Sequence, residues 1–208
     1  MIRAAIVGLG WWGQNHVRAA RDSSKIRFTR GFCDEQGLDL TDSFDDVLAD
    51  PDIDAVVLVT PHSQHIDQIV AASAAGKHVL TEKPFSLHKA EGLRGIAAAK
   101  AAGITLGIGH NYRYAAAVSE IKRMVDAGEF GEIHHIEANL SHQGQIGVEG
   151  WRRNAEEAPT GGIVHFGAHM IDIMCWYCGP MKRVFGQTTS HIMPADCGSV
   201  LVAFESGV

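Results

Sequence analysis

The chain has few of the features that mark secreted, membrane or nucleic-acid-binding proteins. Its 208 residues include only four cysteines, too few and too scattered for a disulfide framework, so we expect reduced thiols. No apolar run approaches the roughly 20 residues that span a bilayer, and the first residues lack a signal-peptide pattern. A net charge of −6 provides no basic field for a nucleic acid or an anionic membrane. We therefore expect a cytoplasmic protein with neither partner.

The remaining composition is that of a folded globular protein. Hydrophobic residues make up 46% and charged residues 20% of the chain, which is enough to build a sizeable core. The length allows one large domain or two small ones, and we expect two. Cys175 and Cys178 form a single C-x-x-C in an apolar stretch, and the second pair of a structural zinc site is missing. This pattern favours packing over redox or metal chemistry.

Strand-like and helix-like segments alternate through the first half of the chain. Strands are expected at residues 4–7, 26–33, 55–59, 78–81 and 104–108, and helices at 14–21, 63–75 and 87–102. The run at 55–59 is continuously apolar, which is typical of a strand buried on both faces of a parallel sheet. The fold class is therefore α/β, with a Rossmann-type doubly wound parallel sheet in a first domain at residues 1–113.

The alternation is interrupted after the second strand. Only Glu35, Gln36 and Gly37 separate the end of that strand from the next apolar alternation at residues 38–40. A parallel crossover needs about a dozen residues or more. Either the fold lacks a crossover helix at this point, or the chain lacks residues there.

A second domain is expected at residues 114–208. Its pattern predicts helices at 114–127 and 163–177, strands at 132–142, 183–191 and 199–205, and a polar loop at 144–160. We expect a smaller, truncated α+β domain with an open sheet. An open edge is prone to pairing with another chain, so we also expect a homo-oligomer.

A glycine-rich turn follows the first strand and opens the first helix. Gly8, Gly10 and Gly13 give the G-x-G-x-x-G spacing, in which backbone can approach a pyrophosphate at a helix N-terminus. Asp34 ends the second strand, where its carboxylate can accept hydrogen bonds from an adenosine ribose and would repel a 2′-phosphate. The glycine turn and Asp34 together predict a dinucleotide site that binds NAD in preference to NADP.

Further motifs resemble the Gfo/Idh/MocA family, the oxidoreductases related to glucose-fructose oxidoreductase and inositol dehydrogenase. The similar segments are TPHSQH at 60–65, AGKHVLTEKP at 75–84, NYR at 111–113, GEFGEI at 128–133, WR at 151–152 before the glycines at 161–162, and HMID at 169–172. The chain departs from the family pattern after Asp34, at its stop soon after FESG at 204–207, and at His165, where the family commonly has Asp.

The resemblance implies a set of residues that line the cofactor. Together with the glycine turn and the acidic residue, they are Gly8, Leu9, Gly10, Trp11, Trp12, Gly13, Asp34, Thr60, Pro61, His65, Glu82, Lys83 and Asn111. Either tryptophan can stack beside the cofactor or simply cover the helix start. The resemblance also implies a cis peptide bond between Lys83 and Pro84.

The expected catalytic residues are Lys83, His165, His169 and Asp172. Lys83 ends a predicted strand, where its ammonium can stabilise charge that develops on a substrate oxygen. The other three stand at i, i+4 and i+7 on one helix face. Three interpretations of that face stay open: an acid/base pair oriented by a carboxylate, a metal site, or a polar stripe. The metal site is the least favoured because a third ligand is missing. The resemblance favours His169 as general base, with His165 as its relay partner.

The resulting hypothesis is an NAD(H)-dependent oxidoreductase that acts on the CH–OH group of a polyol, sugar or cyclic diol. Two alternatives stay open. Some relatives use the same groups for NAD-dependent glycoside hydrolysis, and a few bind the nucleotide as non-catalytic sensors. Retention of Lys83 and His169 argues against the sensor, while the departures from the family pattern argue for a degenerate member.

Overall fold

The chain forms two compact units. The computed structural model describes residues 1–32, 38–141, 154, 156–157, 161, 166–191 and 195–208. Its units are Met1–Gly109 and His110–Val208, so the division lies after Gly109, whereas the sequence analysis puts it after Arg113. No helix among the described residues is long and apolar enough to cross a membrane.

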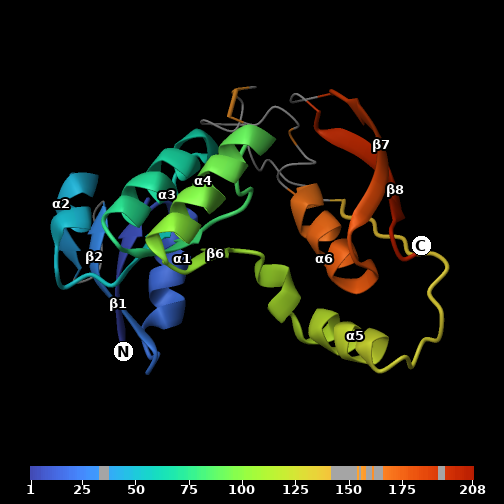
Figure 1. Cartoon of the computed structure of the whole chain (residues 1–208), viewed down its shortest axis with the longest axis horizontal. Coiled ribbons are helices and arrows are strands. Elements are labelled where there is room, and N and C mark those ends of the chain that lie inside the picture. The colour runs from blue at the N-terminus through green and yellow to red at the C-terminus, as the bar shows by residue number, and fades with distance from the viewer. Residues whose placement is uncertain (33–37, 142–153, 155, 158–160, 162–165, 192–194) are drawn as a thin grey trace. The chain divides into compact units, whose positions relative to one another are not determined.

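The first unit is built on a parallel sheet (Figure 1). Its strands are β1 (Ile2–Val7), β2 (Ile26–Phe32), β3 (Asp39–Leu40), β4 (Ala55–Leu58), β5 (His78–Thr81) and β6 (Leu106–Ile108). They lie in the order β3-β2-β1-β4-β5-β6, and every neighbouring pair is parallel. The chain moves outward in one direction from β1 to β3 and in the other from β4 to β6. This confirms the predicted Rossmann-type sheet, whose ligand crevice is at the reversal between β1 and β4.

The central strands are apolar on both faces because helices cover both. Ala5 and Val7 of β1 pack in one cluster, while Ile6 packs in a second cluster on the opposite face. The first cluster includes Val47 of α2 (Phe44–Ala49) and the apolar side of α3 (His65–Ala74). The second includes Val17 of α1 (Trp11–Ala20). Helices α3 and α4 (Lys89–Ala102) pack against each other (Figure 1).

The short connection after β2 joins two strands that are parallel neighbours. Arg30 pairs with Asp39 and Gly31 with Leu40, and the chain between the strands is residues 33–38. That connection is about half the usual minimum for a parallel crossover. The point at which the alternation of strands and helices is interrupted in the sequence is therefore the connection between the parallel strands β2 and β3.

Fewer helices and strands are described in the second unit than in the first. It contains η2 (Asn111–Tyr114), α5 (Ala116–Asp126), α6 (Ala168–Cys178) and the antiparallel strands β7 (Met181–Thr189) and β8 (Cys197–Phe204). The hydroxyl of Tyr177 on α6 donates to the carbonyl of Val118 on α5 at 2.8 Å. Burial raises the pKa of the Cys178 thiol, which keeps it protonated, as expected of a packing residue.

The strand predicted at residues 132–142 was wrong for its described part. Residues 132–141 have no strand hydrogen bonding, and most of them are exposed. Alternating polarity produces a strand only where a neighbouring strand accepts its hydrogen bonds. The only described strand pair in this unit is β7 with β8, and neither pairs with this segment.

Candidate active site

The glycine turn lies at the end of β1, against the end of β4. Gly8 has φ of +97°, and a Cβ there would come within 2.5 Å of the Val59 carbonyl oxygen. A Cβ on Gly13 would come within 2.0 Å of the Gly8 carbonyl oxygen. A Cβ on Gly10 would meet no atom within 4 Å. The first and third glycines are therefore needed by the fold itself, and the second leaves open space at the start of α1.

The start of α1 is suited to an anion. Gly10 is its N-cap, so no side chain caps the first turn, and that turn holds no acidic residue. Uncapped backbone N–H groups and the helix dipole both favour negative charge at this position. Leu9 is buried in the core, so only its backbone is available to a ligand, whereas Trp11 is 74% exposed.

The Glu82-Lys83-Pro84 segment follows β5 and is bonded to α1. The indole Nε1 of Trp12 donates to Oε1 of Glu82 at 2.7 Å, and Nε2 of His16 lies 2.9 Å from the same oxygen. The Lys83 backbone N–H donates to Oε2 of Glu82 at 3.2 Å. The Lys83–Pro84 peptide bond is cis. The sequence-predicted lysine therefore directly follows a residue that is bonded to the glycine turn's helix.

The loop after β4 is joined to the same segment through His65. This side chain is fully buried, with Nδ1 2.9 Å from the Pro84 carbonyl oxygen and Nε2 3.1 Å from the Thr60 carbonyl oxygen. The Thr60 hydroxyl donates to Oε1 of Gln68 at 2.6 Å. Pro61 is the N-cap residue of η1 (His62–Gln64). Burial lowers the pKa of His65, although both carbonyl contacts act in the opposite direction.

A second cluster lies where η2 meets α6 in the second unit. The Tyr112 and His169 rings stack with centroids 4.1 Å apart and planes 10° apart. Arg113 donates from Nε and Nη2 to the two oxygens of Asp172 at 2.7 and 2.6 Å. His110 Nε2 is 3.7 Å from the same carboxylate. The Asp172 side chain is 11% exposed, so this bidentate pair is worth more than a surface ion pair.

Two predicted residues, Asp34 and His165, lie outside the described residues. Asn111 is exposed at the start of η2. The described residues contain no group of three or more His, Cys, Asp or Glu side chains placed to hold a metal.

The chain matches two family models and many solved structures. Residues 2–110 match the model described as the oxidoreductase family with an NAD-binding Rossmann fold, and residues 118–208 match the GFO/IDH/MocA C-terminal domain. The chain belongs to the Gfo/Idh/MocA family. Its first unit is accordingly an NAD(P)-binding Rossmann domain, as the resemblance implied.

Three relatives illustrate the match. An uncharacterized oxidoreductase of Bacillus subtilis, YrbE, is 32% identical over 227 aligned positions, covering 99% of this chain and 64% of the relative. A scyllo-inositol 2-dehydrogenase (NAD(+)) of the same organism is 35% identical over 61% of this chain and 34% of its own length. The WlbA dehydrogenase of Chromobacterium violaceum, solved with NADH and UDP-GlcNAcA, is 29% identical with a TM-score of 0.89, covering 99% of this chain and 64% of that one. The chain thus spans less than two thirds of each relative.

Sequence reasoning missed His16, Tyr112 and Arg113 as site residues. His16 lies in the second turn of α1 and contacts Glu82, which is 66 residues away in the sequence, so local periodicity could not reveal it. Tyr112 and Arg113 belong to the NYR motif, of which only Asn111 was predicted to contact the cofactor. In the structure both residues contact α6, and the partner of Arg113, Asp172, lies 59 residues further along the chain.

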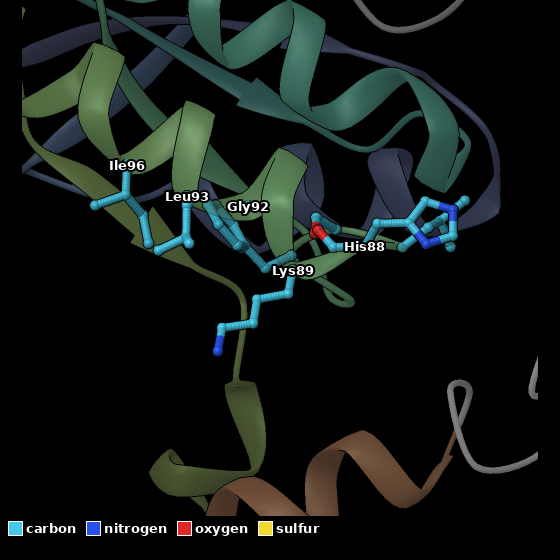
Figure 2. A pocket seen from close by; sticks show the side chains of 8 residues that line it. His88, Lys89, Gly92, Leu93 and Ile96 are labelled. Atoms are coloured by element: carbon cyan, nitrogen blue, oxygen red, sulfur yellow. The ribbon is translucent and has the colours of Figure 1, made fainter.

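An open groove of about 330 Å³ lies elsewhere on the first unit, at the start of α4 (Figure 2). Its lining residues run through the loop after Pro84 and the first turns of the helix: Phe85, Ser86, Leu87, His88, Lys89, Gly92, Leu93 and Ile96. Leu93 and Ile96 are about half exposed, at 56% and 50%. The lining includes no residue of the glycine turn and none of the predicted site residues.

Alanine substitutions at Gly13 and Gly10 should affect different properties of the protein. Gly13→Ala should lower the free energy of unfolding by about 1–3 kcal/mol or more, because its methyl group would overlap the backbone at Gly8. Gly10→Ala should leave that free energy unchanged and weaken nucleotide binding, because its methyl group occupies only open space at the helix start. Urea unfolding and nucleotide titration measure the two effects. Equal stability of the two variants would contradict this account of the turn.

Proposed function

We propose that the protein transfers a hydride between a nicotinamide cofactor and the hydroxyl-bearing carbon of a polyol, sugar or cyclic diol. The observation that carries this proposal is the bond between Trp12 and Glu82, because it joins the glycine turn's helix to the segment that holds Lys83. A lysine beside a dinucleotide-binding turn is where a hydride-transfer site needs a cation. The dehydrogenase names of the scyllo-inositol relative and of WlbA support the same reaction class.

The residues present fit such a cofactor. The open space at Gly10 and the uncapped start of α1 would receive the pyrophosphate, with Gly8 and Gly13 keeping the turn tight. When bound, NAD(P) supplies the hydride acceptor. Thr60, Pro61 and Asn111 stay predicted contacts of the cofactor.

The chain's own residues accept the proton and stabilise the charge that develops on the substrate. In the oxidative direction, the substrate hydroxyl gives its proton to the His169 ring while the C–H bond yields the hydride and a carbonyl forms. The Lys83 ammonium stabilises the negative charge that develops on the oxygen. Asp172 is held by Arg113, and the stacked Tyr112 ring fixes the plane of His169. The His165 relay stays a prediction.

A panel of polyols and sugars with NAD⁺ tests the proposed function directly. We expect the absorbance of the reduced cofactor to rise with at least one cyclic polyol or sugar. Release of a reducing sugar from a glycoside without net cofactor reduction would instead identify NAD-dependent hydrolysis. Nucleotide binding without turnover of any substrate would support a sensor and contradict the proposal.

The cofactor preference rests on Asp34, whose carboxylate would repel the 2′-phosphate of NADP. We expect NAD⁺ to bind at least about tenfold more tightly than NADP⁺, a difference of about 1.4 kcal/mol. Calorimetric titration of the chain with each nucleotide measures this ratio. Asp34→Ser should narrow it by removing the repulsion, whereas Asp39→Ser, on β3, should leave it unchanged. Tighter binding of NADP⁺ by the wild-type chain would contradict the preference.

A further inference from the structure

Glu82 is an acidic side chain whose carboxylate is surrounded by donors of its own unit. Trp12 and His16 reach Oε1 from α1, and the Lys83 backbone N–H reaches Oε2 from the next residue of the chain. The residue is only 9% exposed. Both carboxylate oxygens are therefore engaged by the protein, from two separate segments.

The charge of Glu82 depends on these donors. Burial raises the pKa of its carboxyl group, but the contacts with His16, Trp12 and the Lys83 backbone N–H together outweigh burial and hold the pKa below its ordinary value. Glu82 is therefore ionised at neutral pH. A buried carboxylate that loses a donor is costly to keep in place, because no water replaces the lost hydrogen bond.

The space around the carboxylate is closed from a third direction by Gly109. This residue follows β6, and a Cβ built on it would lie 2.8 Å from Oε1 and 3.0 Å from Cδ of Glu82. Its backbone N–H donates to the Thr81 carbonyl oxygen at 2.8 Å, so the backbone of Gly109 is itself tied to β5. A side chain at position 109 would displace the carboxylate rather than the backbone.

His65 holds the other end of the same segment. Its contact with the Pro84 carbonyl oxygen, together with its contact with Thr60, ties that end to the loop after β4. Lys83 is thus flanked by Glu82, which is bonded to α1, and by Pro84, whose carbonyl oxygen contacts His65 at the start of α3. Neither bond involves the lysine side chain, so both constrain its backbone.

We propose that Glu82, held by Trp12 and His16, is a positioning residue that fixes the Lys83 backbone relative to the glycine turn. Glu82 acts through its neighbours and touches no reacting atom in this role. It couples nucleotide occupancy at the start of α1 to the placement of the lysine, because Trp12 belongs to the first turn of that helix. The catalytic consequence rests on the proposed function, whereas the coupling between Trp12 and Lys83 does not.

Amide exchange of Lys83 tests the coupling in the full chain without nucleotide. Glu82→Gln, Trp12→Phe and Gly109→Ala should each speed exchange of the Lys83 amide by about tenfold, the factor expected from one lost charge-assisted hydrogen bond. Trp12→Phe keeps the ring and removes the N–H, and Gly109→Ala leaves every donor intact. Arg18→Gln, on the exposed face of α1, is the matched control and should exchange like the wild type. Unchanged exchange in Trp12→Phe and Gly109→Ala would overturn the proposal, even where Glu82→Gln fails to fold.

Steady-state kinetics with NAD⁺ and an active substrate test the catalytic consequence. Trp12→Phe and Gly109→Ala should lower kcat by about tenfold, with a smaller change in the KM of the substrate, because a displaced lysine acts on developing charge. An equal kcat with faster amide exchange would overturn the positioning role. Should the wild-type chain turn over no substrate, the proposed function fails, and the exchange experiment still decides whether Glu82 couples Trp12 to Lys83.

Discussion

Lys83→Met should lower kcat by about a hundredfold or more while changing nucleotide affinity much less. Methionine keeps most of the length and apolar volume of lysine and removes the ammonium. The ammonium should act on charge that grows on the substrate oxygen in the transition state, so its loss appears in kcat more than in binding. The structure supports this assignment because the lysine follows Glu82, which is bonded to the glycine turn's helix.

The control for this experiment is Lys89→Met. Lys89 is an exposed lysine at the start of α4, and it lines the separate groove (Figure 2). Its removal changes the net charge by the same amount and should leave kcat unaltered. Titration with NAD⁺ separates the two possible roles of Lys83. Wild-type turnover in Lys83→Met would remove its catalytic role, and a loss confined to nucleotide affinity would make it a binding residue.

The sequence was sufficient to predict most of the first unit because its signals are local, although it missed the short helix α2 (Phe44–Ala49). Each apolar run was short and bounded, and each helix ended at a glycine or before a turn, so strand and helix alternated in the way that produces a parallel sheet. The glycine spacing identified the turn that the structure places between β1 and α1. Gly8 and Gly13 were predictable because close backbone contacts exclude all other residues from these positions.

The contacts that organise the candidate site were not predictable in this way. The bond between Trp12 and Glu82 joins residues 70 positions apart, and the bidentate pair of Arg113 with Asp172 joins residues 59 positions apart. Hydrophobic periodicity says which face of an element is buried, but not which polar residue lies opposite it. The family motifs included Glu82 and the NYR segment, yet only the folded chain shows which hydrogen-bond partner each of them has.

The position of Asp172 on the helix was predicted correctly, but its partner Arg113 was not. The i, i+3 spacing from His169 suggested that the carboxylate fixes the tautomer of that ring. The structure instead shows the carboxylate in a two-point pair with Arg113, which raises the pKa of the guanidinium. Through this pair η2 is fastened to α6, so Asp172 helps to place Tyr112 against His169.

His169→Ala should lower kcat by about 10²–10⁴ and remove the acidic limb of the pH–rate profile, because no base would then accept the hydroxyl proton. His135→Ala is the matched control: its side chain is 71% exposed, and its contact with Glu137 is a surface pair. Tyr112→Phe should retain most activity because the stacked ring is kept. Tyr112→Ala should shift the pH–rate profile, because the His169 ring would no longer be held in one plane by stacking.

The shape of that profile also tests the relay with His165. Two imidazoles that share a proton titrate as a pair, so the apparent pKa of the wild-type limb should belong to neither histidine alone. His165→Asp should keep most activity, because an ionised carboxylate can stabilise a protonated His169. Stoichiometric metal in the purified protein, together with loss of activity on chelation, would replace the relay with a metal site. A wild-type rate in His169→Ala would contradict the general-base assignment, since the proton would then leave by a route that needs no imidazole.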